Sequence, residues 1–166
     1  GNYSIGSPTT GASIPTTGTA TYTGATGGRY SSAAGLDYFF SSNLSATANY
    51  ATRSVALTST SSVVSRDLLS QSSMNALNFT GSMTYAVASN SLTGTINTAG
   101  GLSGTAKGQF YGPNANELGG SFTAAGAGVE LFSGAFGYVA KSTVAVGIIL
   151  WYLELLFNNF GLISPQ

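Results

Sequence analysis

The chain has 166 residues, of which five are Lys or Arg, five are Asp or Glu, and none is His or Cys. Its charged fraction is 6% and its formal net charge is zero, so the basic surface that nucleic-acid binding requires is missing. Without His or Cys the chain has no Ser-His-Asp triad, no Cys nucleophile, no disulfide and no zinc site of the His/Cys type. Hydrophobic residues make up 43% of the sequence, which is enough to build a folded core. We expect a folded protein that holds no metal and no cofactor.

The first segment, residues 1–17, reads GNYSIGSPTTGASIPTT. It consists mainly of Gly, Ser, Thr and Pro, a composition typical of linkers. We predict a linker or a loosely docked arm ahead of a domain that spans residues 18–142.

From residue 18 onward, apolar and polar residues alternate with a period of two, most clearly between Leu77 and Val87. This alternation is typical of strands with one buried and one wet face. It predicts eight strands, at 19–24, 43–50, 52–58, 77–87, 91–97, 103–111, 117–124 and 131–139. Eight regularly spaced antiparallel strands indicate a barrel or a sandwich, and glycines at inward positions beside Phe and Tyr favour the barrel. We therefore predict an all-β fold, an eight-stranded antiparallel filled β-barrel followed by a hydrophobic C-terminal tail.

Two connections between these strands differ from simple hairpin turns. Residues 65–71 are predicted to form a short helix, with Ser65 as its N-cap and Asp67 in its first turn. In the second connection, residues 112–120, Asn114 is positioned to cap a single helical turn. Glu117 follows three residues later, as in a capping box.

With its flanking strands, the second connection reads GQFYGPNANELGGSF over residues 108–122. This run resembles the hallmark of the transferrin-binding protein B type of β-barrel, a strand that ends in G-x-F-x-G-P-x-A-x-E-x-G-G-x-F. The runs TGTATYTG at 17–24 and GAFG at 134–137 are similar to the first and last strands of that family. The residues that carry the central motif are Phe110, Gly112, Pro113, Asn114, Glu117, Gly119, Gly120 and Phe122.

The resemblance implies an eight-stranded, filled barrel on a Gram-negative surface lipoprotein or a secreted binder. The expected location is therefore the Gram-negative cell surface, the outer membrane or the medium. The motif implies a fold and no particular ligand: Phe110 and Phe122 would point into the barrel, and the Gly-Pro-Asn turn would fix one corner.

The sequence changes character over residues 143–166, which contain the only Trp and a high density of large aliphatic residues. No turn signal interrupts this tail before Asn158, so we predict a helix of about 20 residues, roughly 30 Å long and as thick as the hydrocarbon core of a bilayer. Three uses remain open: burial against protein, insertion into a membrane, and a foreign tail. Because an exposed apolar helix is avoided in soluble monomers, we expect self-association, a partner complex or a membrane. The expected contact residues are Ile148, Ile149, Leu150, Trp151, Leu153, Leu156, Phe157 and Phe160.

Three consecutive aromatic residues, Tyr38, Phe39 and Phe40, precede the second predicted strand. A strand can bury only every other residue on one face, so at least one ring should be exposed or covered by another element. We expect either a contact for a protein partner or packing over the barrel mouth or under the N-terminal arm.

The carboxylates lie in five different connections or segments, so their spacing suggests no catalytic pair. We predict that the chain is not an enzyme. The first hypothesis is a surface or secreted binding module that engages a protein partner through its loops and outer face. The alternative is a structural subunit of a homo-oligomeric surface assembly or membrane complex, held together by the tail.

Overall fold

The computed structural model describes residues 6–67, 70–126 and 130–141, the last four of these without their side chains. The hydrophobic tail predicted at 143–166 lies outside the described residues.

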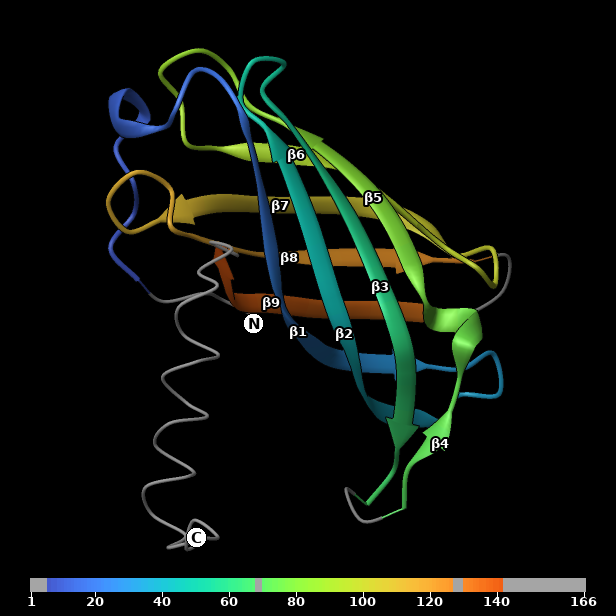
Figure 1. Cartoon of the computed structure of the whole chain (residues 1–166). Helices are drawn as coiled ribbons and strands as arrows, with labels where there is room; N and C mark the ends of the chain where they lie inside the picture. The colour runs from blue at the N-terminus through green and yellow to red at the C-terminus, as the bar shows by residue number, and fades with distance from the viewer. Residues whose placement is uncertain (1–5, 68–69, 127–129, 142–166) are drawn as a thin grey trace, which may run out of the picture.

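Eight long antiparallel strands form a closed ring (Figure 1). Each long strand pairs with the next along the chain, and the last pairs with the first. The strands are β1 (Thr19–Ser31), β2 (Asp37–Asn49), β3 (Ser54–Ser65), β5 (Phe79–Thr84), β6 (Leu92–Thr98), β7 (Ser103–Tyr111), β8 (Glu117–Ala125) and β9 (Leu131–Lys141). A two-residue strand, β4 (Ser72–Ser73), extends the sheet beside the end of β3, and the 3-10 turns η1 (Gly11–Ser13) and η2 (Asn75–Leu77) complete the described elements. The predicted all-β, eight-stranded barrel is confirmed.

The first two strands are longer than the sequence predicts. They pair in unbroken register from Thr19 opposite Asn49 to Ser31 opposite Asp37. The glycine pair at 27–28, which resembles a hairpin turn in the sequence, lies inside β1, and β1 pairs with β9 along its other edge. A Cβ atom on Gly28 would lie 2.0 Å from the carbonyl oxygen of Ser133 on β9. Glycine here allows two strands to approach closely, as barrel closure requires.

The helix predicted at 65–71 is wrong for every described residue of that stretch. Ser65 ends β3, and Arg66 and Asp67 form a bend. The Asp67 carboxylate accepts a 2.8 Å hydrogen bond from the backbone N–H of Ser70. Short polar side chains that bind nearby backbone in this way compete with helix formation, and the helix-start pattern in the sequence therefore produces a turn.

The capping-box turn predicted between β7 and β8 is also absent. Residues 112–115 form a hairpin turn with positive φ at Gly112 (73°), Asn114 (60°) and Ala115 (57°), and Glu117 is already the first residue of β8. Side-chain contacts from outside the turn hold this shape. The Tyr22 hydroxyl donates a 2.8 Å hydrogen bond to the carbonyl of Ala115.

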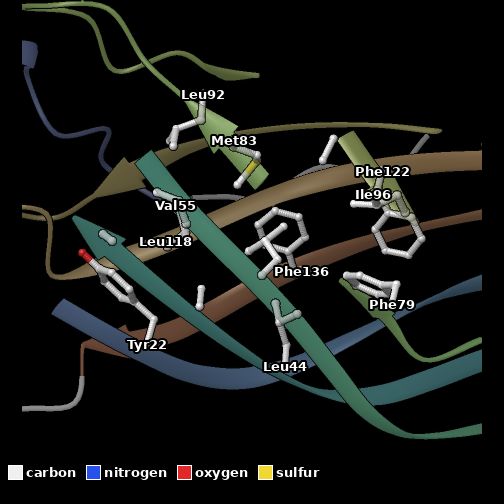
Figure 2. Close-up of a cluster of buried hydrophobic side chains, with 14 of the residues drawn as sticks. Tyr22, Leu44, Val55, Phe79, Met83, Leu92, Ile96, Leu118, Phe122 and Phe136 are labelled. Carbon is white, nitrogen blue, oxygen red and sulfur yellow. The ribbon is translucent and has the colours of Figure 1, made fainter. Parts of the chain in front are cut away.

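Inward-facing side chains from every long strand fill the barrel (Figure 2). The bulkiest fully buried ones are Tyr22, Phe79, Phe110, Phe132 and Phe136. The period-two alternation in the sequence places apolar residues at these inward positions. The clear exception is Val87, the last residue of the alternating run from Leu77, which is 75% exposed because β5 ends at Thr84.

The N-terminal arm is packed against one end of the barrel from residue 6 onward. Pro8 pairs with Tyr111, and the Thr9 N–H donates a 3.0 Å hydrogen bond to the carbonyl of Phe110. Further along the arm, Ile14 is buried in the core. In the described residues the arm therefore behaves as part of the fold and not as a loose linker.

Asn90 ties the arm to the barrel. Its Nδ2 donates to the carbonyls of Thr9 (2.7 Å) and Phe110 (2.8 Å), and its Oδ1 accepts from the Phe110 N–H (2.7 Å). Because Asn90→Ala removes three bonds and leaves partly buried backbone groups unpaired, it should lower the free energy of unfolding by about 2–3 kcal/mol in urea denaturation. Asn97→Ala, at an exposed position on β6, is the matched control and should change little. Equal losses in the two variants would contradict the role of Asn90.

Gly120, in the second half of the GPNANELGG run, has no space for a side chain. A Cβ atom there would lie 2.2 Å from the carbonyl oxygen of Lys107 and 2.6 Å from the Phe136 ring. Gly120→Ala should therefore destabilise the barrel by about 2–4 kcal/mol, while Ser121→Ala beside it stays within about 0.5 kcal/mol. Thermal and urea unfolding of both variants measure the difference, and an undisturbed Gly120→Ala barrel would refute the tight strand packing.

Candidate partner-binding surface

Large exposed apolar side chains gather at the barrel end opposite the arm. Leu36 (39% exposed) precedes β2, Phe39 (38%) lies on β2, and Leu131 (51%) opens β9. The register brings them together, because Ser31 of β1 lies between Asp37 on one side and Leu131 on the other. Together with Arg29 of β1, these three residues are called the hairpin-end surface below.

Leu36 is the last residue of the loop between β1 and β2. The Ser32 N–H donates to the Leu36 carbonyl (2.9 Å), and the Ser32 hydroxyl accepts from the Leu36 N–H (3.2 Å). Gly35 adopts a φ of 73°, which glycine tolerates without strain. The loop is therefore closed by its own hydrogen bonds and holds Leu36 next to the strand.

The three aromatic residues predicted as partner contacts are separated by the structure. Phe39 points outward, whereas Phe40 is buried and meets the Phe132 ring edge-on at 4.6 Å. Tyr38 is partly buried, and its ring stacks on Tyr30 at 6.1 Å between centroids. They lie within β2 and not ahead of it. The expectation of a contact therefore no longer includes Phe40, which is part of the core.

Sequence reasoning missed Arg29, which faces the same side as Phe39. The two residues are directly opposite in register, and the Arg29 guanidinium carbon lies 4.8 Å from the centre of the Phe39 ring. Among the described residues no carboxylate forms an ion pair with Arg29. A cation held over an aromatic face is thus available to a partner. Arg29 could have been placed beside Phe39 only by pairing β1 with β2 without a break. The glycine pair at 27–28 resembles a turn and hides this pairing in the sequence.

Half of the chain's ten charged residues lie at this same end: Arg29, Asp37, Arg66, Asp67 and Glu130. Asp37 accepts a short hydrogen bond from the Ser31 hydroxyl, and Glu130 accepts one of 2.7 Å from the Tyr30 hydroxyl. In a chain with so few charges, the combination of fixed carboxylates, two arginines and exposed apolar groups sets this end apart.

Two depressions lie at this end of the barrel, one on the exposed Phe39 side of the β2–β3 ribbon and one beside the partly buried Tyr38. One, of about 220 Å³, is lined by Phe39 and Ser41 of β2 and by Val63 of β3. The other, of about 400 Å³, lies between Tyr38, Met74 and the bend that follows β3. The surface is therefore not flat, and a protruding side chain of a partner has somewhere to lie.

The residues of the motif at 108–122, at the arm end of the barrel, have structural roles. Phe110 and Phe122 are buried, Gly112 donates its N–H to the Ser7 carbonyl (2.9 Å), and Gly119 lies where the β8–β9 register shifts. Pro113 and Asn114 form the turn, and Glu117 begins β8. This run therefore shapes the corner where the arm meets the barrel.

The described part of the chain contains no cluster of three or more Asp and Glu side chains that could hold a metal ion. Within the same residues, no helix is both long enough and apolar enough to span a bilayer.

Comparisons with known proteins point to one family. A family model for the C-lobe and N-lobe β-barrels of Tf-binding protein B matches residues 14–140. No curated protein matches the chain.

Solved structures of transferrin-binding protein B (TbpB) share the fold. A mutant TbpB from Haemophilus parasuis Hp5 is 18% identical, with a TM-score of 0.63 over 82% of this chain and 29% of that one. Intact Ap-TbpB, with N and C lobes, is 16% identical, with a TM-score of 0.61 over 81% and 28%. Isotype 1 TbpB from serogroup B Neisseria meningitidis is 20% identical, with a TM-score of 0.59 over 84% and 28%. The chain thus spans less than a third of the length of these proteins.

Tyr30 makes the hairpin-end region sensitive to alkali. Burial, together with the hydrogen bond to Glu130, raises its pKa to about 12, whereas an unfolded Tyr ionises near pH 10. Between these values the unfolded chain releases a proton that the folded chain keeps, so the free energy of unfolding falls as the pH rises. Tyr30→Phe should make the free energy of unfolding fall less steeply with pH, by a slope equivalent to up to about one proton. Urea unfolding between about pH 9 and 12 measures this slope in both proteins. Identical pH slopes in both proteins would contradict the assignment.

Proposed function

Because the chain belongs to the family of the C-lobe and N-lobe β-barrels of transferrin-binding protein B, we propose that it is a non-enzymatic binding module, on the bacterial cell surface or secreted, that engages a protein partner. The solved relatives are named for binding transferrin. A protein-binding role for this shorter chain is supported by that kinship, and the partner's identity is left to experiment.

The observation that carries the proposal is the position of the exposed apolar groups. The barrel interior is filled by side chains, so a protein partner has to meet the loops or the outer wall. On the described surface, three of the four large exposed hydrophobic residues belong to the hairpin-end surface, and only Val87 lies at the other end.

The chemistry of the hairpin-end surface suits a protein contact. Aromatic residues and Arg dominate binding energy at interfaces when a rim of other residues excludes water from them. Phe39 under the Arg29 guanidinium combines both kinds in one pair. Leu36 and Leu131 extend the apolar area, and the surrounding charges supply a polar rim. Phe39 and Arg29 are therefore the expected centre of the contact.

The experiment immobilises the full chain and measures saturable binding of purified host serum proteins, transferrin included. For a partner found in this way, Phe39→Ala and Leu131→Ser should each weaken binding at least about tenfold, since they remove anchors at the centre of the contact. Val87→Ala is the matched control, because it removes an even more exposed apolar side chain at the opposite end. A partner that binds all three variants equally would place the contact elsewhere.

A second candidate function rests on the sequence of the tail. Residues 143–166 are dominated by large apolar residues, which favours a structural subunit of a homo-oligomeric surface assembly or a membrane complex. Light scattering of the full chain with and without detergent separates the two candidates. A large species that persists without detergent would support the subunit, whereas a monomer that needs detergent would support a membrane-attached binding module.

A further inference from the structure

A pocket of about 400 Å³ lies at the barrel end away from the arm, where β4 and the end of β3 run side by side (Figure 1). It is enclosed by Tyr38, Val64, Met74 and the bend that follows β3. Its volume falls within the range of roughly 300–1,000 Å³ that is usual for small-molecule sites, which often occupy the mouths of β-barrels. It is called the mouth pocket below.

The mouth pocket lies on the inward face of the strands and not on the outer wall. Phe40 and Val64 are opposite each other in register and both are buried, so they point inward. Tyr38 lies two residues before Phe40 and therefore shares this face. Ser72 is paired with Val64 and lies on the same face as its partner. The exposed Phe39 lies on the opposite face, so the mouth pocket is separate from the contact centred on Phe39.

The floor of the mouth pocket is apolar and aromatic. Tyr38 is partly exposed, and its ring is stacked on Tyr30 with 6.1 Å between centroids. Tyr30 is buried, and its hydroxyl donates a 2.7 Å hydrogen bond to the Glu130 carboxylate, which holds the ring pair in place. Val64 and the partly buried Met74 complete the floor. A ring held in this way offers a rigid surface to a ligand with an apolar face.

Hydroxyl and charged groups form the rim of the mouth pocket. The Asp67 carboxylate accepts hydrogen bonds from the Ser65 hydroxyl (3.3 Å), the Ser70 N–H (2.8 Å) and the Ser70 hydroxyl (3.3 Å), which tie the bend together. Both Arg66 and Ser72 line the pocket and are exposed. Their side chains have no hydrogen-bond or ion-pair partner among the residues that the structure describes. The guanidinium donors and the Ser72 hydroxyl are therefore available to a ligand.

The charges of the rim favour a neutral ligand. Arg66 and Asp67 contribute one charge of each sign. An anion attracted by the guanidinium is repelled by the neighbouring carboxylate, and the reverse holds for a cation. A neutral ligand with several hydroxyl groups meets no such repulsion, and each hydroxyl both donates and accepts hydrogen bonds. A pyranose ring combines such hydroxyls with an apolar C–H face that matches the Tyr38 ring.

We propose that the mouth pocket binds a neutral pyranose sugar: one face of the sugar ring packs on Tyr38 and Met74, and its hydroxyl groups form hydrogen bonds with the Arg66 guanidinium and the Ser72 hydroxyl. The same chemistry occurs in a free saccharide and in a glycan carried by a glycoprotein, and the experiment separates these two sources. The sugar site adds a ligand to the binding module proposed above. It does not depend on the protein contact centred on Phe39, so the two proposals can fail separately.

Saturation-transfer NMR and isothermal titration on the full chain test the proposal with the methyl pyranosides of glucose, galactose, mannose and N-acetylglucosamine. At least one should bind with a dissociation constant of about 1–20 mM, with the strongest saturation at the C–H protons of one ring face. Sorbitol, which has the hydroxyl groups without the ring, should bind at least about tenfold more weakly. The methyl pyranoside of glucuronic acid should bind no more tightly than that of glucose, because the rim does not favour an anion.

Desialylated fetuin, before and after enzymatic removal of its glycans, separates the two sources. Tighter binding of the intact glycoprotein than of the methyl pyranosides, lost when the glycans are removed, would assign the sugar to a protein-linked glycan. Binding of the intact glycoprotein no tighter than that of the methyl pyranosides would assign it to a free saccharide.

Three variants test the named contacts. Tyr38→Leu keeps an apolar side chain but removes the ring, whereas Arg66→Gln and Ser72→Ala each remove hydrogen-bonding groups. Each should weaken binding of the best pyranoside at least about threefold. Because Arg66 and Ser72 are exposed, their variants keep the test valid if Tyr38→Leu disturbs the stacked rings.

Two control variants lie outside the mouth pocket. Ser73→Ala removes the same hydroxyl group from the neighbouring residue of β4, whose side chain lies on the other face of the strand. Lys107→Gln removes an equal charge from the outer face of β7. Both should bind like the parent chain. No saturable binding of any of the four pyranosides up to about 50 mM, unchanged affinity in Arg66→Gln and Ser72→Ala, or tighter binding of the glucuronic acid derivative by about tenfold or more would overturn the proposal.

Discussion

Closing eight strands into one ring is the constraint on which the rest of this structure depends. A ring of this size leaves an interior that side chains fill, and here they come from every long strand. Closure also forces strands to bend and approach closely. The neighbouring strands therefore leave no space for a Cβ atom at Gly28 or Gly120. Because the interior is filled, a partner can contact only the outer wall and the two ends of the barrel.

The two ends of the barrel differ in physical character. At the arm end, the hydroxyls of Tyr22 and Tyr50 are hydrogen-bonded at 2.7 Å, and the backbone of the arm is tied to β7 through Asn90. Polar groups there are mostly hydrogen-bonded within the protein, and the buried Tyr85 hydroxyl, which has no partner among the described residues, is the exception. At the other end, apolar and charged side chains are exposed together, with Arg29 over Phe39. The arm end is therefore held together by internal hydrogen bonds, whereas the opposite end presents exposed apolar and charged side chains.

The alternation in the sequence was sufficient to predict the barrel and most of its core, because inward positions must be apolar wherever one face of a strand is buried. It failed where distant residues decide the outcome. Gly27 and Gly28 resemble a turn until β2 and β9 are paired on either side of them, and the turn at 112–115 is held by Tyr22 and the arm. The sequence shows that at least one of the three consecutive aromatic residues has to be exposed or covered by another element, but it does not single out Phe39. The pairing of Phe39 with Arg29 follows only from the full β1–β2 register.

Binding of a protein partner at the hairpin-end surface is tested most directly by hydrogen–deuterium exchange of the full chain, alone and in complex with the partner that it binds. If the partner binds there, exchange should slow on binding in peptides covering residues 29–41 and 130–133, where Arg29, Phe39 and Leu131 lie. Slower exchange confined to the arm and to residues 84–92 and 111–117, with residues 29–41 unchanged, would contradict it.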